Sequence, residues 1–226
     1  MLVLLGVGGW LYYSQLAKPE VQFVTQQEVQ ADTLTDGTIV ILNKRSLLRY
    51  PDRFEDESRQ VWLTKGEAFF AVKSADQTPF YVTVASTTIK TDSGTFNVRK
   101  LGGRVEVISE NARLELSRNG KEIVIEPGEK SVLKQNNSDL FKEKNTSQLY
   151  KYYRNNEFIT QGTPLPQLLK TLNESFDSSI IIRRKKLNNL KLTGTYKSNS
   201  LDSILRKISH QHQIRIERKQ NRIFLY

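Results

Sequence analysis

The chain has 226 residues, no cysteine, and 34 Lys and Arg residues against 24 Asp and Glu residues, which gives a formal net charge of +10. This length is typical of one or two domains that bury a core without disulfides, and the lack of cysteine excludes a thiol nucleophile and a thiolate metal site. Residues 1–150 contain 19 basic and 19 acidic residues and residues 151–226 contain 15 and 5, so the excess positive charge lies in the C-terminal third. Such a basic region favours an acidic protein partner, a nucleic acid or a membrane surface.

The first 16 residues are almost entirely apolar and end before Lys18-Pro19. A helix of this length would span about 24 Å at about 1.5 Å per residue, less than the ~30 Å of a bilayer's hydrocarbon core. A signal peptide is disfavoured because no basic residue precedes the apolar run and residues 15–17 form a poor cleavage site. A buried core helix is disfavoured by the lack of polar periodicity. We therefore expect residues 1–20 to be the outer part of a transmembrane helix that begins before Met1.

The next stretch of the chain carries clear strand and turn signals. Asp36-Gly37 favours a turn, because glycine tolerates positive φ and aspartate can accept a hydrogen bond from its own backbone. The β-branched run at residues 38–42 predicts a strand that is buried on both faces. After a second turn at Asn43-Lys44, residues 47–50 predict another strand, which Pro51 ends.

Short segments of alternating polarity continue to residue 134. Their apolar members are Val61/Leu63, Phe69/Ala71, Phe80/Val82/Val84, Val105/Val107, Leu114/Leu116 and Ile123/Ile125. Turn signals between them are Ser93-Gly94, Gly102-Gly103, Asn119-Gly120 and Pro127-Gly128. Many short strands at this spacing predict one all-β domain over residues 21–134, built as a sandwich, a roll or a solenoid-like stack.

Residues 135–149 are polar and poor in large apolar side chains, which predicts a linker. In the domain that follows, residues 150–226, two segments have helical periodicity. The first begins with Pro164, which is tolerated in a first helical turn. Its apolar positions are Leu165, Leu168, Leu169, Leu172 and Phe176. The second follows Ser200 as its expected N-cap, with Leu201, Ile204, Leu205 and Ile208 on one face.

Apolar strand segments lie between and after these two helices, at residues 180–182, 190–195, 214–216 and 223–225. The resulting order, β-α-β-β-α-β-β, predicts a small α+β domain whose last two strands form a hairpin. The whole chain is therefore expected to be mainly β, with a membrane helix, then the all-β domain, then the α+β domain.

Five spaced motifs of the all-β domain point to a family. In chain order they are D-G-T-x-V-x-L-N (Asp36 to Asn43), S-x-L-x-Y-P (Ser46 to Pro51), G-E-A-F-F-x-V (Gly66 to Val72), P-F (Pro79-Phe80) and G-T-F-N-V-R (Gly94 to Arg99). Together they resemble the FecR-type transmembrane anti-sigma factors, regulators that sense the uptake of iron-siderophores or glycans. The resemblance covers roughly residues 25–135, and five motifs in the right order are far more specific than any one of them.

The C-terminal domain carries a second set of motif positions, at Phe158, Pro164-Leu165, Ile180–Ile182, Leu192–Tyr196 and Ser200–Leu205. It resembles the domain that usually follows FecR in one large bacterial group. That domain is similar to the secretin/TonB N-terminal signalling fold. A Trp is common there where this chain has Tyr152 or Tyr153, so the resemblance leaves the first residue of the domain open.

The resemblance implies an inner-membrane protein with one span, whose residues after about position 18 lie in the periplasm. Its implied partner is the signalling domain of a TonB-dependent outer-membrane transporter. It further implies control of an extracytoplasmic-function (ECF) sigma factor through a cytoplasmic domain ahead of the span, and that domain is missing from this sequence. An anti-sigma factor of this kind is a signal transducer and not an enzyme.

Residues that could act in catalysis or metal binding lack partners in the sequence. Glu67 has no second acid, base or nucleophile at a usable spacing and is expected to pair with a strand edge or turn. His210 and His212 flank a helix end without a third ligand, which favours a solvated helix exit over a metal site. Gly94-Thr95 precedes no helix and is expected to form the turn at the start of a strand. We therefore predict no catalytic, metal-binding or cofactor-binding residue.

A basic run is the candidate partner-binding site. It comprises Arg183, Arg184, Lys185 and Lys186, supported by Arg215, Arg218 and Arg222 with Lys219. It could be a solvated loop or a docking surface for an acidic partner. A nucleic-acid-binding protein is the alternative function, but it needs aromatic platforms, and the nearest rings are Phe224, expected to be buried, and Tyr226. An envelope enzyme with a β core is a third possibility, for which the chain offers no acid pair.

Overall fold

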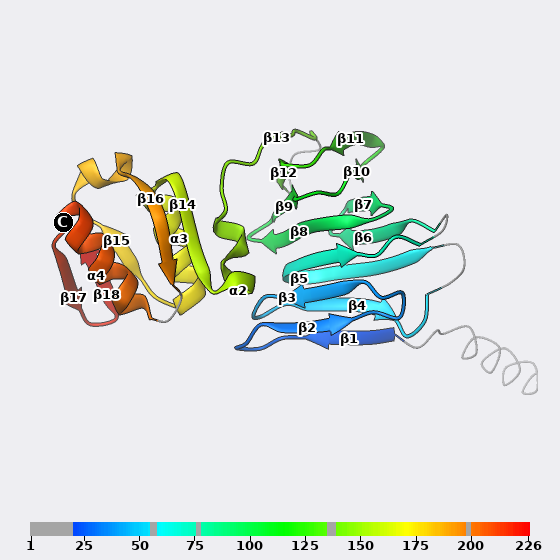
Figure 1. The fold of residues 1–226 in the computed structure, drawn as a ribbon, viewed down its shortest axis with the longest axis horizontal. Coiled ribbons are helices and arrows are strands. Elements are labelled where there is room, and N and C mark those ends of the chain that lie inside the picture. The colour runs from blue at the N-terminus through cyan, green and yellow to red at the C-terminus, as the bar shows by residue number, and fades with distance from the viewer. Residues whose placement is uncertain (1–19, 55–57, 76–77, 135–138, 198–199) are drawn as a thin grey trace, which may run out of the picture. The chain divides into compact units, whose positions relative to one another are not determined.

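The computed structural model describes residues 20–54, 58–75, 78–134, 139–197 and 200–226. It divides into two compact units, residues 1–145 and 146–226 (Figure 1). The expected membrane helix lies outside the described residues, except for Glu20, which begins the first strand. Among the described residues, no helix combines the length and apolar composition required to cross a bilayer.

The N-terminal unit is all β, as predicted. Its strands are β1 (Glu20–Val24), β2 (Gln30–Thr33), β3 (Ile39–Leu42), β4 (Leu47–Pro51), β5 (Arg59–Val72), β6 (Phe80–Val84), β7 (Thr87–Thr91), β8 (Gly94–Leu101), β9 (Arg104–Ser109), β10 (Leu114–Arg118), β11 (Lys121–Ile125), β12 (Glu129–Lys134) and β13 (Glu143–Lys144). Within the described residues they form one 13-stranded sheet. All pairings are antiparallel except β5 with β6.

Strand β5 organises this sheet because its two halves have different neighbours. Residues 59–65 pair with β4 and β6, whereas residues 66–72 pair with β3 and β8. One layer therefore runs β1-β4-β5-β6-β7-β10-β11 and the other runs β2-β3-β5-β8-β9-β12-β13. The sheet curls so that both layers contribute to one core (Figure 1). Phe70 of β5 stacks on Phe96 of β8 at 5.1 Å and contacts Phe80 of β6 at 6.0 Å between ring centroids.

Gly66 lies at the change of neighbours in β5. Its φ is +87°, and a Cβ at this position would lie 2.1 Å from Ser46 Oγ and 2.6 Å from Ser46 Cα. Both the backbone conformation and the close approach of the β3–β4 connection therefore require glycine.

The prediction that residues 38–42 are buried on both faces is wrong. Val40 and Leu42 are completely buried, but Ile39 is 45% exposed. Successive side chains of a strand point to opposite faces, and only the Val40 face packs against the core. The apolar run alone could not reveal that the second face is open.

The C-terminal unit has the predicted β-α-β-β-α-β-β order. Its elements are the 3₁₀ helix η1 (Leu149–Lys151), α2 (Tyr152–Asn155), β14 (Glu157–Pro164), α3 (Leu165–Phe176), β15 (Ile180–Ile182), the 3₁₀ helix η2 (Lys185–Asn189), β16 (Lys191–Lys197), α4 (Leu201–His212), β17 (Ile216–Lys219) and β18 (Arg222–Leu225). β14 and β16 form a two-stranded antiparallel sheet. β15 pairs in parallel with β18, which forms the predicted hairpin with β17.

The ends of the two long helices follow the sequence signals. Ser200 caps α4, accepting a hydrogen bond at 3.0 Å from the backbone N–H of Ser203. Pro164 is the residue before α3, and Pro166 lies in its first turn, where a missing N–H costs nothing.

The segment predicted as a linker, residues 135–149, is partly regular structure. β13 pairs with the first residues of β12, and η1 begins at Leu149. Two ion pairs flank this pairing, Lys142–Glu129 at 2.9 Å and Lys130–Glu143 at 3.2 Å. A polar segment can pair through its backbone with a free strand edge without any apolar signal, which is why composition suggested a linker.

Candidate partner-binding surface

Glu67, the one acidic residue considered for catalysis, is the centre of a buried hydrogen-bond network. Its Oε2 accepts from Asn43 Nδ2 at 2.9 Å and its Oε1 accepts from Asn97 Nδ2 at 3.0 Å. Burial raises the pKa of the Glu67 carboxyl, and the positive charge of Arg99 opposes that shift. The carboxyl thus links the turn at Asn43 and strand β8 to β5. The expected pairing with a turn is confirmed, and the side chains involved are buried.

The network continues through two buried hydroxyls. Ser46 Oγ accepts from the backbone N–H of Glu67 at 2.9 Å. Thr25 Oγ1 accepts from the backbone N–H of Ser46 at 2.9 Å and donates to the carbonyl of Asn43 at 2.6 Å. Every one of these contacts joins two protein segments, so the motif residues Asn43, Ser46, Glu67 and Asn97 connect β5 to β8 and to the β3–β4 connection.

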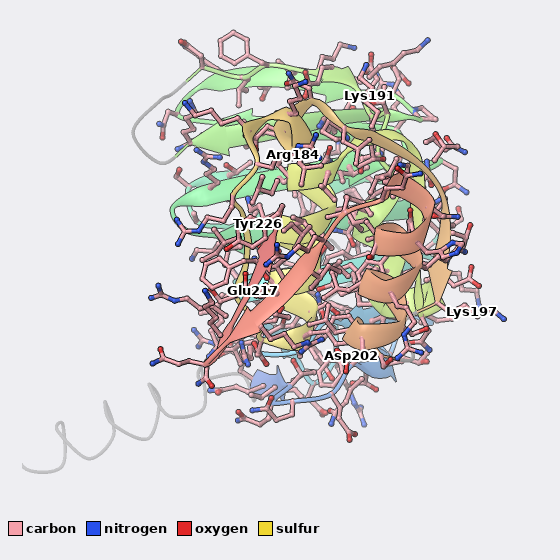
Figure 2. All side chains as sticks on the ribbon, turned by 90° about the vertical axis from the view of Figure 1, so that its left-hand side faces the viewer. Arg184, Lys191, Lys197, Asp202, Glu217 and Tyr226 are labelled. Carbon is pink, nitrogen blue, oxygen red and sulfur yellow. The ribbon has the colours of Figure 1, made fainter. Side chains whose placement is uncertain are left out.

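The three-stranded sheet of the C-terminal unit has one face toward the helices and one face away from them. Register places Ile180, Ile223 and Arg218 in one row, and Arg218 pairs with Asp202 at the start of α4. The helices therefore lie on that side. The opposite side, which we call the outer sheet face, carries Ile181, Arg183, Arg215, Glu217, Lys219, Arg222, Phe224 and Tyr226. In Figure 2, Glu217 and Tyr226 lie to one side of β17, and Asp202 on α4 lies to the other.

Two arginines of the outer sheet face cover its aromatic rings. The guanidinium of Arg183 lies 4.8 Å from the ring centroid of Phe224, and that of Arg215 lies 5.5 Å from the ring of Tyr226. Phe224 is only 7% exposed, as expected for a buried residue. Its side chain nevertheless lies on the outer sheet face, next to Arg183 and away from the helices.

The charges of the outer sheet face are unbalanced. Glu217 is the acidic residue in the described parts of β15, β17 and β18, and it contacts Lys219 Nζ at 2.9 Å and Arg215 at 3.6 Å. These cations, Lys219 first, lower the pKa of the Glu217 carboxyl. The outer sheet face therefore has one carboxylate and four basic side chains, those of Arg183, Arg215, Lys219 and Arg222. The basic side chains form a cationic rim around an aromatic centre, which consists of Phe224 and Tyr226.

The basic residues considered as the binding site do not form one surface. Arg183, Arg215, Lys219 and Arg222 share the outer sheet face. Arg218 lies on the helix-facing side in an ion pair with Asp202. Arg184, Lys185 and Lys186 are exposed where β15 leads into η2. The positions of the arginines over the rings were not predicted, although the alternation of Arg222, Phe224 and Tyr226 indicates that these three side chains share one face.

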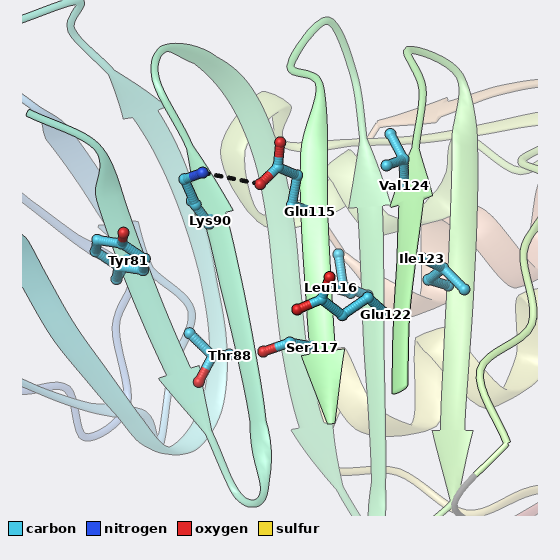
Figure 3. Close-up of a pocket in the computed structure, with 9 residues that line it drawn as sticks. All are labelled: Tyr81, Thr88, Lys90, Glu115, Leu116, Ser117, Glu122, Ile123 and Val124. Atoms are coloured by element: carbon cyan, nitrogen blue, oxygen red, sulfur yellow. Dashed lines mark hydrogen bonds and ion pairs between the residues drawn. The ribbon is translucent and has the colours of Figure 1, made fainter. Parts of the chain in front are cut away.

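The N-terminal unit has a groove with a volume of about 590 Å³ (Figure 3). It crosses β6, β7, β10 and β11, and its lining residues are Tyr81, Thr88, Lys90, Glu115, Leu116, Ser117, Glu122, Ile123 and Val124. Lys90 Nζ and Glu115 Oε2 form an ion pair at 2.9 Å across it, which lowers the pKa of the Glu115 carboxyl. An ionised, paired carboxylate is unsuited to donating a proton in catalysis.

Metal ligands do not gather in the described residues, where no group of three His, Cys, Asp or Glu side chains could hold an ion. His210 and His212 both lie in the last turn of α4, His210 exposed and His212 half-buried.

Two family models match the chain in order. The FecR protein model matches residues 22–113, and the FecR C-terminal model matches residues 157–225. The chain belongs to the FecR family. The two matches fall on the all-β unit and the α+β unit respectively, and they assign the chain to a family of anti-sigma signal transducers. The motif-based expectation of a FecR-type protein is confirmed.

Solved structures support the same assignment. Two crystal structures of a candidate anti-sigma factor from Parabacteroides distasonis ATCC 8503, at 2.50 Å and 1.65 Å resolution, have 25% sequence identity to the chain and a TM-score of 0.71. The similarity covers 92% of this chain and 99% and 98% of those chains. It therefore extends over both units. Among curated proteins, no sequence matches the chain.

Proposed function

We propose that the chain is the periplasmic part of an inner-membrane signal transducer, which binds the signalling domain of a TonB-dependent outer-membrane transporter and thereby regulates an ECF sigma factor. The family assignment supports the anti-sigma role. The observation that carries the partner proposal is the outer sheet face, with its aromatic centre and cationic rim. Residues 1–20 would supply the membrane anchor.

The chemistry of the outer sheet face favours an acidic protein surface over a nucleic acid. Binding of single-stranded nucleic acid relies on aromatic rings that are free to stack on bases. Here Arg183 and Arg215 already occupy positions over Phe224 and Tyr226. Guanidinium groups held in place by rings lose little freedom on binding and form directed, bidentate hydrogen bonds to carboxylates. Charge complementarity of this kind gives specificity and a high association rate.

Charge reversal tests the proposal. The full chain is titrated with each purified signalling domain of the TonB-dependent transporters encoded in the same genome. One domain is expected to bind, and the double variant Arg183→Glu, Arg222→Glu should weaken that binding at least about tenfold and flatten its dependence on salt. The matched control is Lys134→Glu with Lys170→Glu, two exposed lysines outside the outer sheet face, because this pair changes the net charge by the same amount. Equal affinity of the double variant and the control would remove the outer sheet face from the proposal.

The nucleic-acid alternative is tested with the same protein. A nucleic-acid binder would retard DNA or RNA in a gel at moderate salt, with affinity that falls steeply as salt rises. We expect no retardation at concentrations that saturate the signalling domain. Retardation that is stronger than binding to every signalling domain would favour the alternative function.

A further inference from the structure

In the part of the C-terminal unit that the structure describes, one edge of β16 pairs with β14 and the other edge faces α4. Within the described residues, β14 is the one strand that pairs with β16. Between the other edge of β16 and α4 lies a groove of about 610 Å³, lined by Glu157, Thr195, Tyr196, Lys197, Ser203, Ile204 and Lys207. We call it the β16–α4 groove. It belongs entirely to the C-terminal unit and contains none of the residues of the outer sheet face.

A lysine side chain occupies the hydrogen-bonding position that a neighbouring strand would use. Lys207 Nζ donates to the carbonyl of Thr195 at 2.9 Å. That carbonyl therefore points toward α4 and away from β14. Because backbone groups alternate in direction along a strand, the N–H and C=O groups of Thr193 and Lys197 point the same way as those of Thr195. The groove thus exposes a row of backbone donors and acceptors in the spacing that an added strand requires.

The charges around the groove select an acidic segment. Lys197 and Lys207 face it from β16 and α4, against Glu157 from β14. Ser203 lies in the first turn of α4, where the helix dipole favours negative charge. The ammonium of Lys207 also lies 5.3 Å from the ring centroid of Tyr196, so it stays at the groove when its bond to Thr195 is released. Lys207 both protects an open strand edge and supplies a cation for an incoming carboxylate.

We propose that the β16–α4 groove binds an extended acidic segment next to the folded signalling domain of the partner, and that this segment adds to β16 as a strand. A backbone N–H of the segment replaces Lys207 as the donor to the carbonyl of Thr195. Lys207 then pairs with a carboxylate of the segment. The inference rests on the proposed function, because it gives the same partner a second contact. Two linked contacts raise the affinity of the complex through effective concentration.

Amide hydrogen exchange of the unmodified full chain tests strand addition directly. The amides of Thr193, Thr195 and Lys197 point away from β14 and should exchange rapidly in the free chain. When a transporter signalling domain, purified with its adjacent segments, saturates the chain, these amides should exchange at least about tenfold more slowly. Alternate amides of β16, which are bonded to β14, serve as internal references because their protection should change little.

The outcomes separate this inference from the proposed function. A signalling domain that binds without slowing exchange at Thr193, Thr195 and Lys197 overturns strand addition and leaves the proposed function intact. Failure of every signalling domain to bind overturns both.

A charge-reversal pair supplies a second measurement. Lys207→Glu should weaken binding at least about tenfold relative to Lys170→Glu, which changes charge by the same amount on α3. Removal of the acidic segment from the signalling domain should abolish the difference between these two variants. A difference that persists without the segment would show that Lys207 acts elsewhere and would contradict the inference.

Discussion

Arg59 Nη1 donates to Asp36 Oδ2 at 2.8 Å, and the two side chains are only 3% and 8% exposed. The same guanidinium donates to the carbonyls of Lys73 at 2.7 Å, Thr78 at 3.0 Å and Asp92 at 3.1 Å. It also lies 5.5 Å from the ring centroid of Phe80. One buried cation at the start of β5 therefore joins the Asp36-Gly37 turn to two further connections, β5–β6 through Lys73 and Thr78 and β7–β8 through Asp92.

Replacement of Arg59 by an uncharged residue is expected to destabilise the N-terminal unit. In Arg59→Met, the Asp36 carboxylate and three carbonyls lose a buried donor, which should lower the free energy of unfolding by about 3–5 kcal/mol. The measurement is urea unfolding of the full chain, followed by circular dichroism. Arg49→Met is the control, since the Arg49–Glu20 pair is exposed and surface pairs contribute about 0–1 kcal/mol. Similar losses in both variants would contradict the assigned role of Arg59.

Gly66 should tolerate no side chain. Gly66→Ala places a Cβ against Ser46 and also imposes positive φ on alanine. We expect a loss of more than about 3 kcal/mol, beyond the ~1–2 kcal/mol of backbone strain alone. Gly120→Ala is the matched control, because Gly120 has φ +76° and no atom within 4 Å of the added Cβ. Thermal unfolding of the two variants separates the clash from the strain, and equal melting temperatures would exclude the clash.

Because the pKa of Glu67 is raised in the folded chain, the free energy of unfolding should depend on pH. The folded state holds the proton of the Glu67 carboxyl more tightly than the unfolded state does. The stabilisation from Glu67 is therefore complete below its unfolded pKa of about 4.3 and declines as pH rises through the folded pKa. The unfolding free energy of the native chain minus that of Glu67→Gln should decrease from pH 4 to pH 8 in urea titrations. A difference that grows with pH would mean that the Asn43 and Asn97 hydrogen bonds outweigh the cost of burying the charge.

The structure and the sequence-based interpretation differ in the role that they give Arg218 in partner binding. Its side chain pairs with Asp202 on the helix-facing side, so Arg218→Met should leave affinity for the signalling domain within about twofold of the native value. Its stability should change by no more than about 1 kcal/mol, as for other exposed ion pairs. Arg215→Met, on the outer sheet face, should weaken binding to the signalling domain by several-fold. Isothermal titration calorimetry of both variants measures the two affinities. Equal effects of the two variants would contradict the division between the faces.

Local signals in the sequence predicted most of the secondary structure. The helix after Ser200 was predicted with its cap, because a capping serine and apolar residues at helical spacing act within one or two turns. The Asp36-Gly37 turn and the strand ending at Pro51 were predicted for the same reason, and Thr38 N–H does donate to Asp36 Oδ1 at 2.9 Å. The seven-element order of the C-terminal unit follows from these short-range preferences.

Long-range contacts decided the features that the sequence could not supply. The exposure of Ile39, the pairing of β13 and the opposite orientations of Arg215 and Arg218 depend on which strand or helix lies alongside, at separations of many residues. The burial of Glu67 between Asn43 and Asn97 joins positions 24 and 30 residues apart. No local sequence pattern predicts that these three side chains are in contact.

The sequence by itself determined the family, the order of the elements and the location of the excess positive charge in the C-terminal third, because motif spacing, periodicity and charge are properties of the chain alone. Only the tertiary structure decided which cations share a face, which ring each one covers and which strand edge stays open. Those features depend on how separate segments pack against one another, and packing is fixed by the whole fold and not by neighbours in sequence.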